Sequence, residues 1–244
     1  MSNETGKYLY CILEGTELEP INLSGIGSDS QIYTISYKDL LAVVSDTEKF
    51  IFDPTHENAL AHEEVISEVM KSTTVVPMSF GNVFNSEEDI KVLLESVYDE
   101  IKDVLKKVAG KIELGVKAFW DYDEIMKEIK AENQELANLE QADYQFQMRI
   151  GQEVAQLVDE KKAYYITEII EPLNELAIAS KENRTVGDRM ILNAAFLIER
   201  DVEEEFDVKV NEIYERFKDE LKFKYTGPWP PYNFINIKLE VKDS

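Results

Sequence analysis

One stretch of ten residues, YTGPWPPYNF (225–234), has the least backbone freedom in the sequence. It holds three of the seven prolines, and each proline fixes φ at about −65° and removes a backbone N–H donor. Gly227-Pro228 and Pro230-Pro231 therefore require turn and polyproline geometry. The flanking runs, KFKYTG (222–227) and NFINIKLEV (233–241), have the composition of strands. We predict a rigid bend between two strands.

Three interpretations of this bend are open. Trp229 could close the core under the connection, the rigid aromatic edge could dock a partner, or the prolines could be a ligand for an SH3-type domain. Nothing in the sequence around the bend suggests a mobile ligand. We favour packing by Trp229, because a segment stiffened by proline loses less entropy when it closes over a core.

The first third of the chain alternates short apolar runs with a helical period. KYLYCIL (7–13) indicates a buried strand, and QIYTIS (31–36) with LLAVVS (40–45) indicates a hairpin. Residues 54–72 have apolar residues at helical spacing, with Asp53 as the expected N-cap. These signals predict strands packed against an amphipathic helix.

The same alternation continues to residue 120. Residues 73–84 indicate a strand, a tight turn and a short strand, and a helix is expected from Ser86 to about Gly110. KIELGVKAFW (111–120) alternates apolar and polar residues as a strand does. From residue 40 to 120 the order is that of a ferredoxin-like sandwich with extra strands in front.

The rest of the sequence predicts a second helix-and-sheet unit. Residues 122–179 are mostly helical in pattern, with Pro172 expected to kink or break the helix. DRMILNAAFLIER (188–200) indicates a strand, and residues 201–221 indicate an amphipathic helix.

The formal charge of −23 limits the partners. Nucleic acids and anionic membrane surfaces are disfavoured, because both are themselves anionic. No apolar run approaches the roughly 18 residues of a membrane span, and the sequence around KYLYCIL shows no secretion signal. Cys11 is the only cysteine, so no internal disulfide is possible. We expect a cytoplasmic protein that binds neither nucleic acid nor membrane.

The residues that catalysis usually needs are scarce. His56 and His62 lie six positions apart, so they do not form the H-E-x-x-H motif of zinc proteases, and we expect them on a solvated helix face. No phosphate-binding loop or nucleophile elbow occurs in the sequence. Carboxylates close together in the sequence do not indicate acid–base catalysis here, because they occur throughout a chain this acidic. We predict no enzyme, no catalytic residue, no metal and no cofactor.

Seven segments together make the sequence similar to a known family. They are YLYCIL (8–13), LLAVVS (40–45), HEEVI (62–66), VVPMSFGNVF (75–84), ELGVK (113–117), LNAAFLI (192–198) and TGPWPPYNF (226–234). The sequence resembles the gas vesicle accessory proteins of the GvpF/GvpL family over nearly its whole length. It departs from the pattern at Ser79, where arginine is common, and at Cys11, where glycine is common.

The resemblance implies a two-domain α+β fold. Residues 1–120 would form a modified ferredoxin-like antiparallel sheet with helices on one face, and residues 121–244 a second α+β domain with a long helical segment at 122–179. It also implies a set of motif residues with structural or interaction roles: Pro77, Phe80, Gly81, Gly115, Asn193, Gly227, Pro228, Trp229, Pro230, Pro231 and Tyr232.

The resemblance implies a function in building gas vesicles, the protein-walled buoyancy organelles of some bacteria and archaea. The chain would be a minor structural component or assembly factor that binds the hydrophobic wall protein and other accessory proteins. One alternative is a scaffold that binds only accessory proteins. Another is a small-ligand-binding or enzymatic domain, since ferredoxin-like sheets host many functions.

Overall fold

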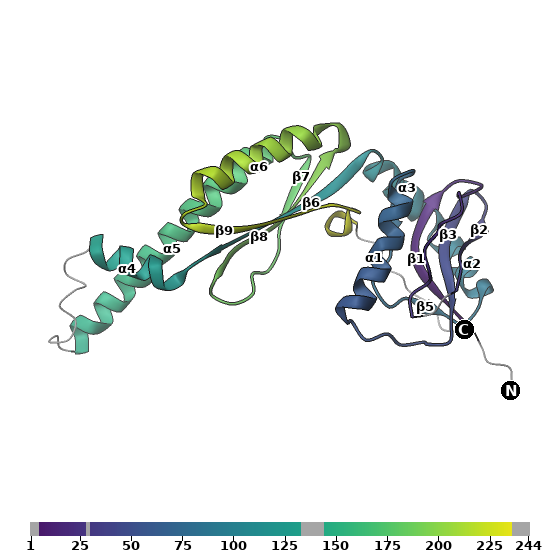
Figure 1. Cartoon of the computed structure of the whole chain (residues 1–244), viewed down its shortest axis with the longest axis horizontal. Helices are drawn as coiled ribbons and strands as arrows, with labels where there is room; N and C mark the ends of the chain where they lie inside the picture. Colours follow the sequence, from purple (N-terminus) through teal and green to yellow (C-terminus); the bar gives the residue numbers. More distant parts are fainter. Residues whose placement is uncertain (1–4, 28–29, 133–143, 236–244) are drawn as a thin grey trace. The chain divides into compact units, whose positions relative to one another are not determined.

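A computed structural model describes residues 5–27, 30–132 and 144–235. The chain divides into two compact units, Met1–Ile112 together with Trp229–Ser244, and Glu113–Pro228 (Figure 1). The segment from Trp229 thus returns to the first unit. Compactness alone does not tell which segments fold independently. The division into domains at 1–120 and 121–244 therefore stays a prediction.

The first unit is built on one antiparallel sheet with strand order β2-β3-β1-β4, and β5 pairs with β1 on the same side as β4. Its strands are β1 (Gly6–Glu14), β2 (Ile32–Tyr37), β3 (Leu40–Thr47), β4 (Val75–Pro77) and β5 (Val83–Phe84). The predicted hairpin is confirmed, because β2 and β3 pair in register up to Tyr37 and Leu40. Lys38 takes the left-handed conformation that the tight turn requires, with φ of 52°.

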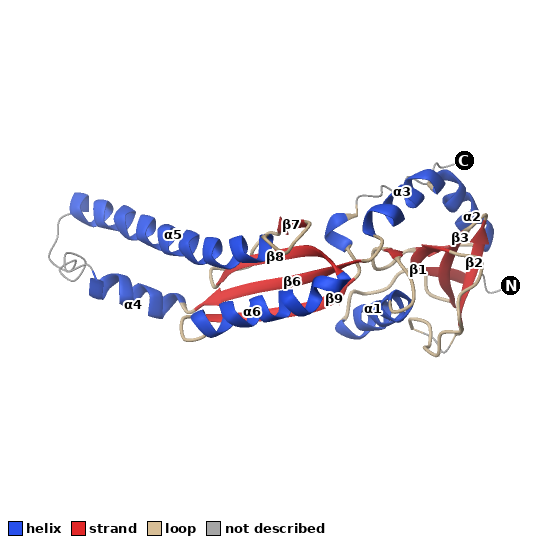
Figure 2. Ribbon diagram, turned by 90° about the horizontal axis from the view of Figure 1, so that it is seen from above, coloured by secondary structure: helices blue, strands red, loops and turns tan. Residues whose placement is uncertain are grey.

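Helices cover both faces of this sheet (Figure 2). The helix α1 (His56–Met70) packs on one face, and α2 (Glu87–Ser96) and α3 (Tyr98–Val108) pack on the other. The prediction of helices on one face is therefore wrong. The reason lies in the apolar run of β1, where consecutive side chains point to opposite faces and are all buried.

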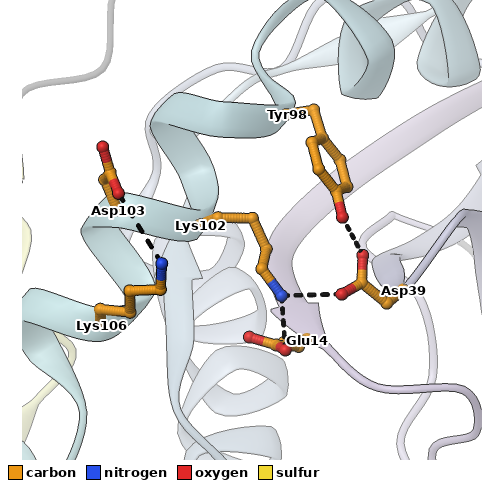
Figure 3. A network of polar contacts seen from close by, with 6 residues as sticks. All are labelled: Glu14, Asp39, Tyr98, Lys102, Asp103 and Lys106. Atoms are coloured by element: carbon orange, nitrogen blue, oxygen red, sulfur yellow. Dashed lines mark hydrogen bonds and ion pairs between the residues drawn. The ribbon is translucent and has the colours of Figure 1, made fainter.

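A polar cluster fixes α3 to the β2–β3 turn (Figure 3). The Lys102 ammonium lies 2.7 Å from Asp39 Oδ2 and 2.5 Å from Glu14 Oε1, and the Tyr98 hydroxyl donates to Asp39 Oδ1. The hydrogen bonds from Lys102 and then Tyr98 lower the pKa of Asp39 to about 2. These groups stay solvent-accessible, so they orient the turn more than they stabilise the fold.

The second unit has a four-stranded sheet of order β7-β8-β6-β9. Its strands are β6 (Lys111–Trp120), β7 (Ala179–Glu182), β8 (Met190–Glu199) and β9 (Leu221–Trp229), and its helices are α4 (Tyr122–Glu132), α5 (Tyr144–Asn174), the short η2 (Arg200–Val202) and α6 (Glu203–Phe217). The α+β class with two antiparallel sheets is confirmed. The strand at 111–120 was expected in the first sheet but lies in the second. An alternating pattern indicates which face of a strand is buried, but it does not indicate which strand it pairs with.

Aromatic contacts show how α6 lies on this sheet. The Phe206 ring packs 5.4 Å from Phe196 of β8 and 6.4 Å from Tyr225 of β9. The helix predicted at 122–179 is described as α4 and α5, and residues 133–143 lie outside the described ranges. Pro172 sits inside α5, which ends two residues later at Asn174. Residues 179–182 form β7, so the helical pattern ends earlier than predicted.

Candidate functional site

His62 is the most buried polar group of α1, with 3% of its surface exposed. Placing it on a solvated helix face was wrong. It shares the inner face of the helix with Val65, Ile66 and Val69, which lie three, four and seven positions later. His56, at the first position of α1, is exposed as expected.

The hydrogen bonds of His62 define its protonation state. Its Nε2 lies 3.1 Å from the Met78 carbonyl oxygen, which only accepts, so Nε2 carries the proton. Its Nδ1 then accepts from the Tyr8 hydroxyl at 2.9 Å, and that hydroxyl accepts from the Gly81 backbone N–H at 3.0 Å. Burial lowers the pKa of His62 to about 4 and raises that of Tyr8 to about 12. A series of hydrogen bonds between uncharged groups thus joins β1, α1 and the turn at 78–82.

A second buried tyrosine holds the loop that precedes β2. The Tyr10 hydroxyl accepts from the Ile26 backbone N–H at 2.8 Å and is hydrogen-bonded to Ser45 Oγ at 2.8 Å. Its ring stacks on His62 with centroids 5.9 Å apart. The loop 18–27 is therefore anchored to the same cluster as the turn at 78–82.

The motif residues at 77–81 form the rim of this cluster. Pro77 lies in β4 opposite Cys11 of β1. The half-buried Phe80 ring meets His62 and Tyr8 edge-on, at 5.8 and 6.4 Å between centroids. Gly81 has φ of 91°, a conformation that side chains disfavour. Ser79, which precedes Phe80, is exposed, so the position where the family often has arginine faces solvent.

The bend at 226–234 runs from the second unit back to the first. Gly227 has φ of 128°, and a Cβ there would lie 2.8 Å from Leu114 Cδ2, so no larger residue fits without a shift. The Gly227-Pro228 peptide bond is cis. Pro230 and Pro231 are buried, whereas Trp229 at the end of β9 is only half-buried. The residues that follow form the short helix η3 (Tyr232–Phe234) where a strand was expected, and residues 236–241 of that expected strand lie outside the described ranges.

Tyr232 is the aromatic residue of this bend that packs on the cluster of the first unit. Its hydroxyl and the Glu63 Oε2 atom are both inaccessible to solvent and lack a hydrogen bond of good geometry. The two groups still interact electrostatically. Burial, followed by the Glu63 charge, raises the pKa of Tyr232, and burial raises the pKa of Glu63.

Two other motif residues lie in the second unit. Gly115 of β6 faces Thr226, whose Oγ1 would lie 2.8 Å from an added Cβ. The Asn193 side chain of β8 donates to the Arg184 carbonyl at 3.0 Å and so fixes the β7–β8 connection. The structure therefore brings Phe80, Gly81 and Tyr232 to one cluster, and places Gly115, Asn193 and Gly227 in the other unit.

A groove runs between α1 and the loop 18–27, and the sequence patterns had not predicted it. It consists of two hollows of about 600 and 360 Å³ that share Leu23. We call it the α1 groove. Its lining is Leu18, Glu19, Pro20, Ile21, Asn22, Leu23, Ser24, Gly25 and Gly27 from the loop, and Glu57, Asn58, Ala61, Glu64, Val65, Glu68, Val69, Lys71 and Ser72 from α1 and its end. The helical spacing of these α1 positions shows only which side of the helix lines the groove.

The cluster itself offers little chemistry. Both His62 nitrogens are engaged, and burial raises the pKa of the Cys11 thiol well above its ordinary value. In the part of the chain that the structure describes, no group of three or more His, Cys, Asp or Glu side chains could hold a metal ion. No helix among the described residues is long and apolar enough to cross a membrane.

The fold and this arrangement define a two-unit α+β protein with a tyrosine–histidine cluster, an acidic groove and a sheet edge on its first unit. The model of the family "Gas vesicle synthesis protein GvpL/GvpF" matches residues 6–236. The chain therefore belongs to the GvpL/GvpF family, which implies a role in gas vesicle formation. This family is not a known class of enzyme.

Relatives of both types within the family are similar to this chain. Gas vesicle protein F1 of Halobacterium salinarum is 32% identical, with 95% of this chain and 93% of the relative aligned. Gas vesicle protein L1 of the same organism is 27% identical, covering 94% and 90%. The crystal structure of GvpF from Anabaena sp. PCC7120 matches with a TM-score of 0.86 at 25% identity, covering 98% of this chain and 100% of that one.

Proposed function

We propose that this protein acts in gas vesicle assembly as an accessory factor that binds the hydrophobic wall protein through the edge of its first sheet. It works in the cytoplasm at the growing vesicle, together with other accessory proteins. The proposal combines family membership with the geometry of one strand.

The observation that carries the proposal is the outer edge of β2. This strand is last in the sheet and is paired through β3 on its inner side. The bridge between Ser24 and Gln31 lies just before it, and no other described strand pairs with its outer side. The free edge thus offers backbone donors and acceptors to an incoming strand.

The wall protein's expected chemistry suits such an edge. A subunit with a gas-facing apolar surface and unpaired strands would aggregate before it was placed. Pairing with β2 would satisfy its backbone groups, and the net charge of −23 would keep the complex soluble.

The alternatives have less support. A scaffold that binds only accessory proteins would not need a free strand edge. A catalytic role would need reactive groups, and the buried His62 and Cys11 are held as a neutral imidazole and a thiol.

The test is a matched pair of lysine substitutions on two edge strands. Ser36 of β2 and Ser180 of β7 are both exposed serines, and a lysine on an edge opposes strand addition. In a pull-down with the full chain, Ser36→Lys should reduce capture of the wall protein at least about tenfold, and Ser180→Lys should leave it unchanged. Capture of accessory proteins alone by the wild-type chain would instead support the scaffold.

A further inference from the structure

The α1 groove combines an apolar floor with an acidic rim. Leu23, Ala61 and Val65 lie in the floor, and Leu18 and Ile21 continue it towards the end of the helix. Leu23 and Ala61 are only half-buried, so apolar surface remains open to solvent. A groove with apolar side chains at its base and charged residues around it can take the apolar face of a partner helix.

The charges around this floor have one sign. Glu57 and Glu64 border the larger hollow, and Glu19 and Glu68 border the smaller one. The single cation of the lining, Lys71, lies 2.6 Å from Glu68 and is neutralised by it. The other three carboxylates are exposed and form no ion pair with a described residue. The rim therefore attracts a cationic partner.

The backbone of the groove selects a helix over a strand. In the loop 18–27, the backbone of Ser24 already pairs with Gln31 in a bridge, and the Gly25 N–H donates to the Ser30 carbonyl oxygen. The opposite wall is α1, whose amides are bonded within the helix. A strand could not pair with α1 or with these two loop positions, whereas a helix satisfies its own backbone groups.

We propose that the α1 groove docks a basic amphipathic helix of a partner protein, with its leucine-like face on the floor and its lysines or arginines on the rim. The groove positions on α1 and the turn after it run from Glu57 to Ser72, a length of about 22 Å at 1.5 Å per residue. The bound helix therefore has about four turns. This site is separate from the β2 edge and does not depend on wall-protein binding there.

The experiment measures binding of a fluorescent 18-residue helical peptide with leucines on one face and lysines on the other. A second peptide with glutamates in place of the lysines is the control for charge sign. The tested variant is Glu57→Lys with Glu64→Lys, and the matched control is Glu153→Lys with Asp159→Lys on the exposed surface of α5. Both double variants change the net charge equally.

We expect the basic peptide to bind the wild-type chain saturably and the acidic peptide not to bind. The groove variant should lose at least about tenfold in affinity, because two rim contacts become repulsive, and the α5 variant should lose less than about twofold through net charge alone. Leu23→Ala should weaken binding also at high salt, where the rim charges are screened. Equal losses in both double variants, or no saturable binding, would overturn the proposal.

Wall-protein capture by the groove variant separates this site from the proposed function. We expect the variant to capture the wall protein as the wild type does. A shared loss of peptide and wall-protein binding, with the fold intact by circular dichroism, would show that the groove is not a separate site and would refute the proposal as stated.

Discussion

Replacing His62 by glutamine should remove a defined pH dependence of stability. His62 is neutral in the folded protein, and burial lowers its pKa from 6.5 to about 4. Between these two values the unfolded chain binds a proton at this residue and the folded chain does not. The free energy of unfolding contributed by this site is therefore fully present above about pH 6.5 and is lost as the pH falls towards 4.

The magnitude follows from the two pKa values. At about 1.4 kcal/mol for each pKa unit, the full loss is about 3 kcal/mol. Between pH 7 and pH 5 it is about 2 kcal/mol, and pH 5 is still above the pI of about 4.5, so the protein keeps a negative charge. Glu63, whose pKa is raised by burial, works in the opposite direction. It is present in every variant compared, so its effect cancels.

Urea unfolding at pH 7 and pH 5 tests this reasoning on three full chains. His62→Gln keeps one donor and one acceptor but does not titrate. Its loss of stability between the two pH values should be about 2 kcal/mol smaller than that of the wild type. His56→Gln, which alters the other histidine and an exposed one, should behave as the wild type does. If all three proteins lose the same stability on acidification, His62 is not held neutral in the folded state. The assignment of hydrogen bonds from Gly81 through Tyr8 to His62 would then be wrong.

Three further predictions concern the bend and its surroundings. Gly227→Ala should lower the free energy of unfolding by about 1–3 kcal/mol, because of the positive φ at this position and the close contact of an added Cβ with Leu114. Gly151→Ala, in open space on α5, should raise the free energy of unfolding by up to about 1 kcal/mol in the same chemical denaturation. Tyr232→Phe should leave stability unchanged or raise it by up to about 1 kcal/mol, since a buried hydroxyl without a good partner is removed; a clear loss in a thermal melt would show that the hydroxyl is bonded after all. Trp229→Ala should cost about 2 kcal/mol, roughly half the value for a fully buried aromatic residue, whereas an unchanged melt with lost wall-protein binding would favour docking by Trp229.

The sequence patterns predicted local elements better than their neighbours. The β2–β3 hairpin, the strand at 188–200 and the helix at 201–221 followed from short-range periodicity, and the structure has β2, β3, β8 and α6 there. Sheet membership depends on pairing between distant strands, so the place of β6 could not be read from its own residues. The N-cap of α1 is Thr55 and not Asp53, a shift of two residues that local composition does not resolve.

For the site too, local motifs could be predicted from the sequence and contacts between distant segments could not. The motifs at 75–84 and 226–234 are visible in the sequence, but their meeting at one cluster through Tyr232 requires the fold. His62 was misplaced for a different reason. Its distance from His56 excludes a zinc pair but does not decide its burial, whereas its spacing to Val65 and Ile66 puts it on the apolar stripe of the helix. The α1 groove needs the loop 18–27 in place, and that loop has no periodic pattern.

The return of the chain at Trp229 sets an order of events during synthesis. The first unit lacks Tyr232 until the whole of Glu113–Pro228 has been translated. At about 5–20 residues per second, this interval is roughly 6–23 s. During it the cluster around Tyr8 and His62 is uncovered on one side, and Glu63 faces water instead of a phenol ring. A ribosome-bound first unit thus lacks one packing residue of this cluster until the second unit has been translated.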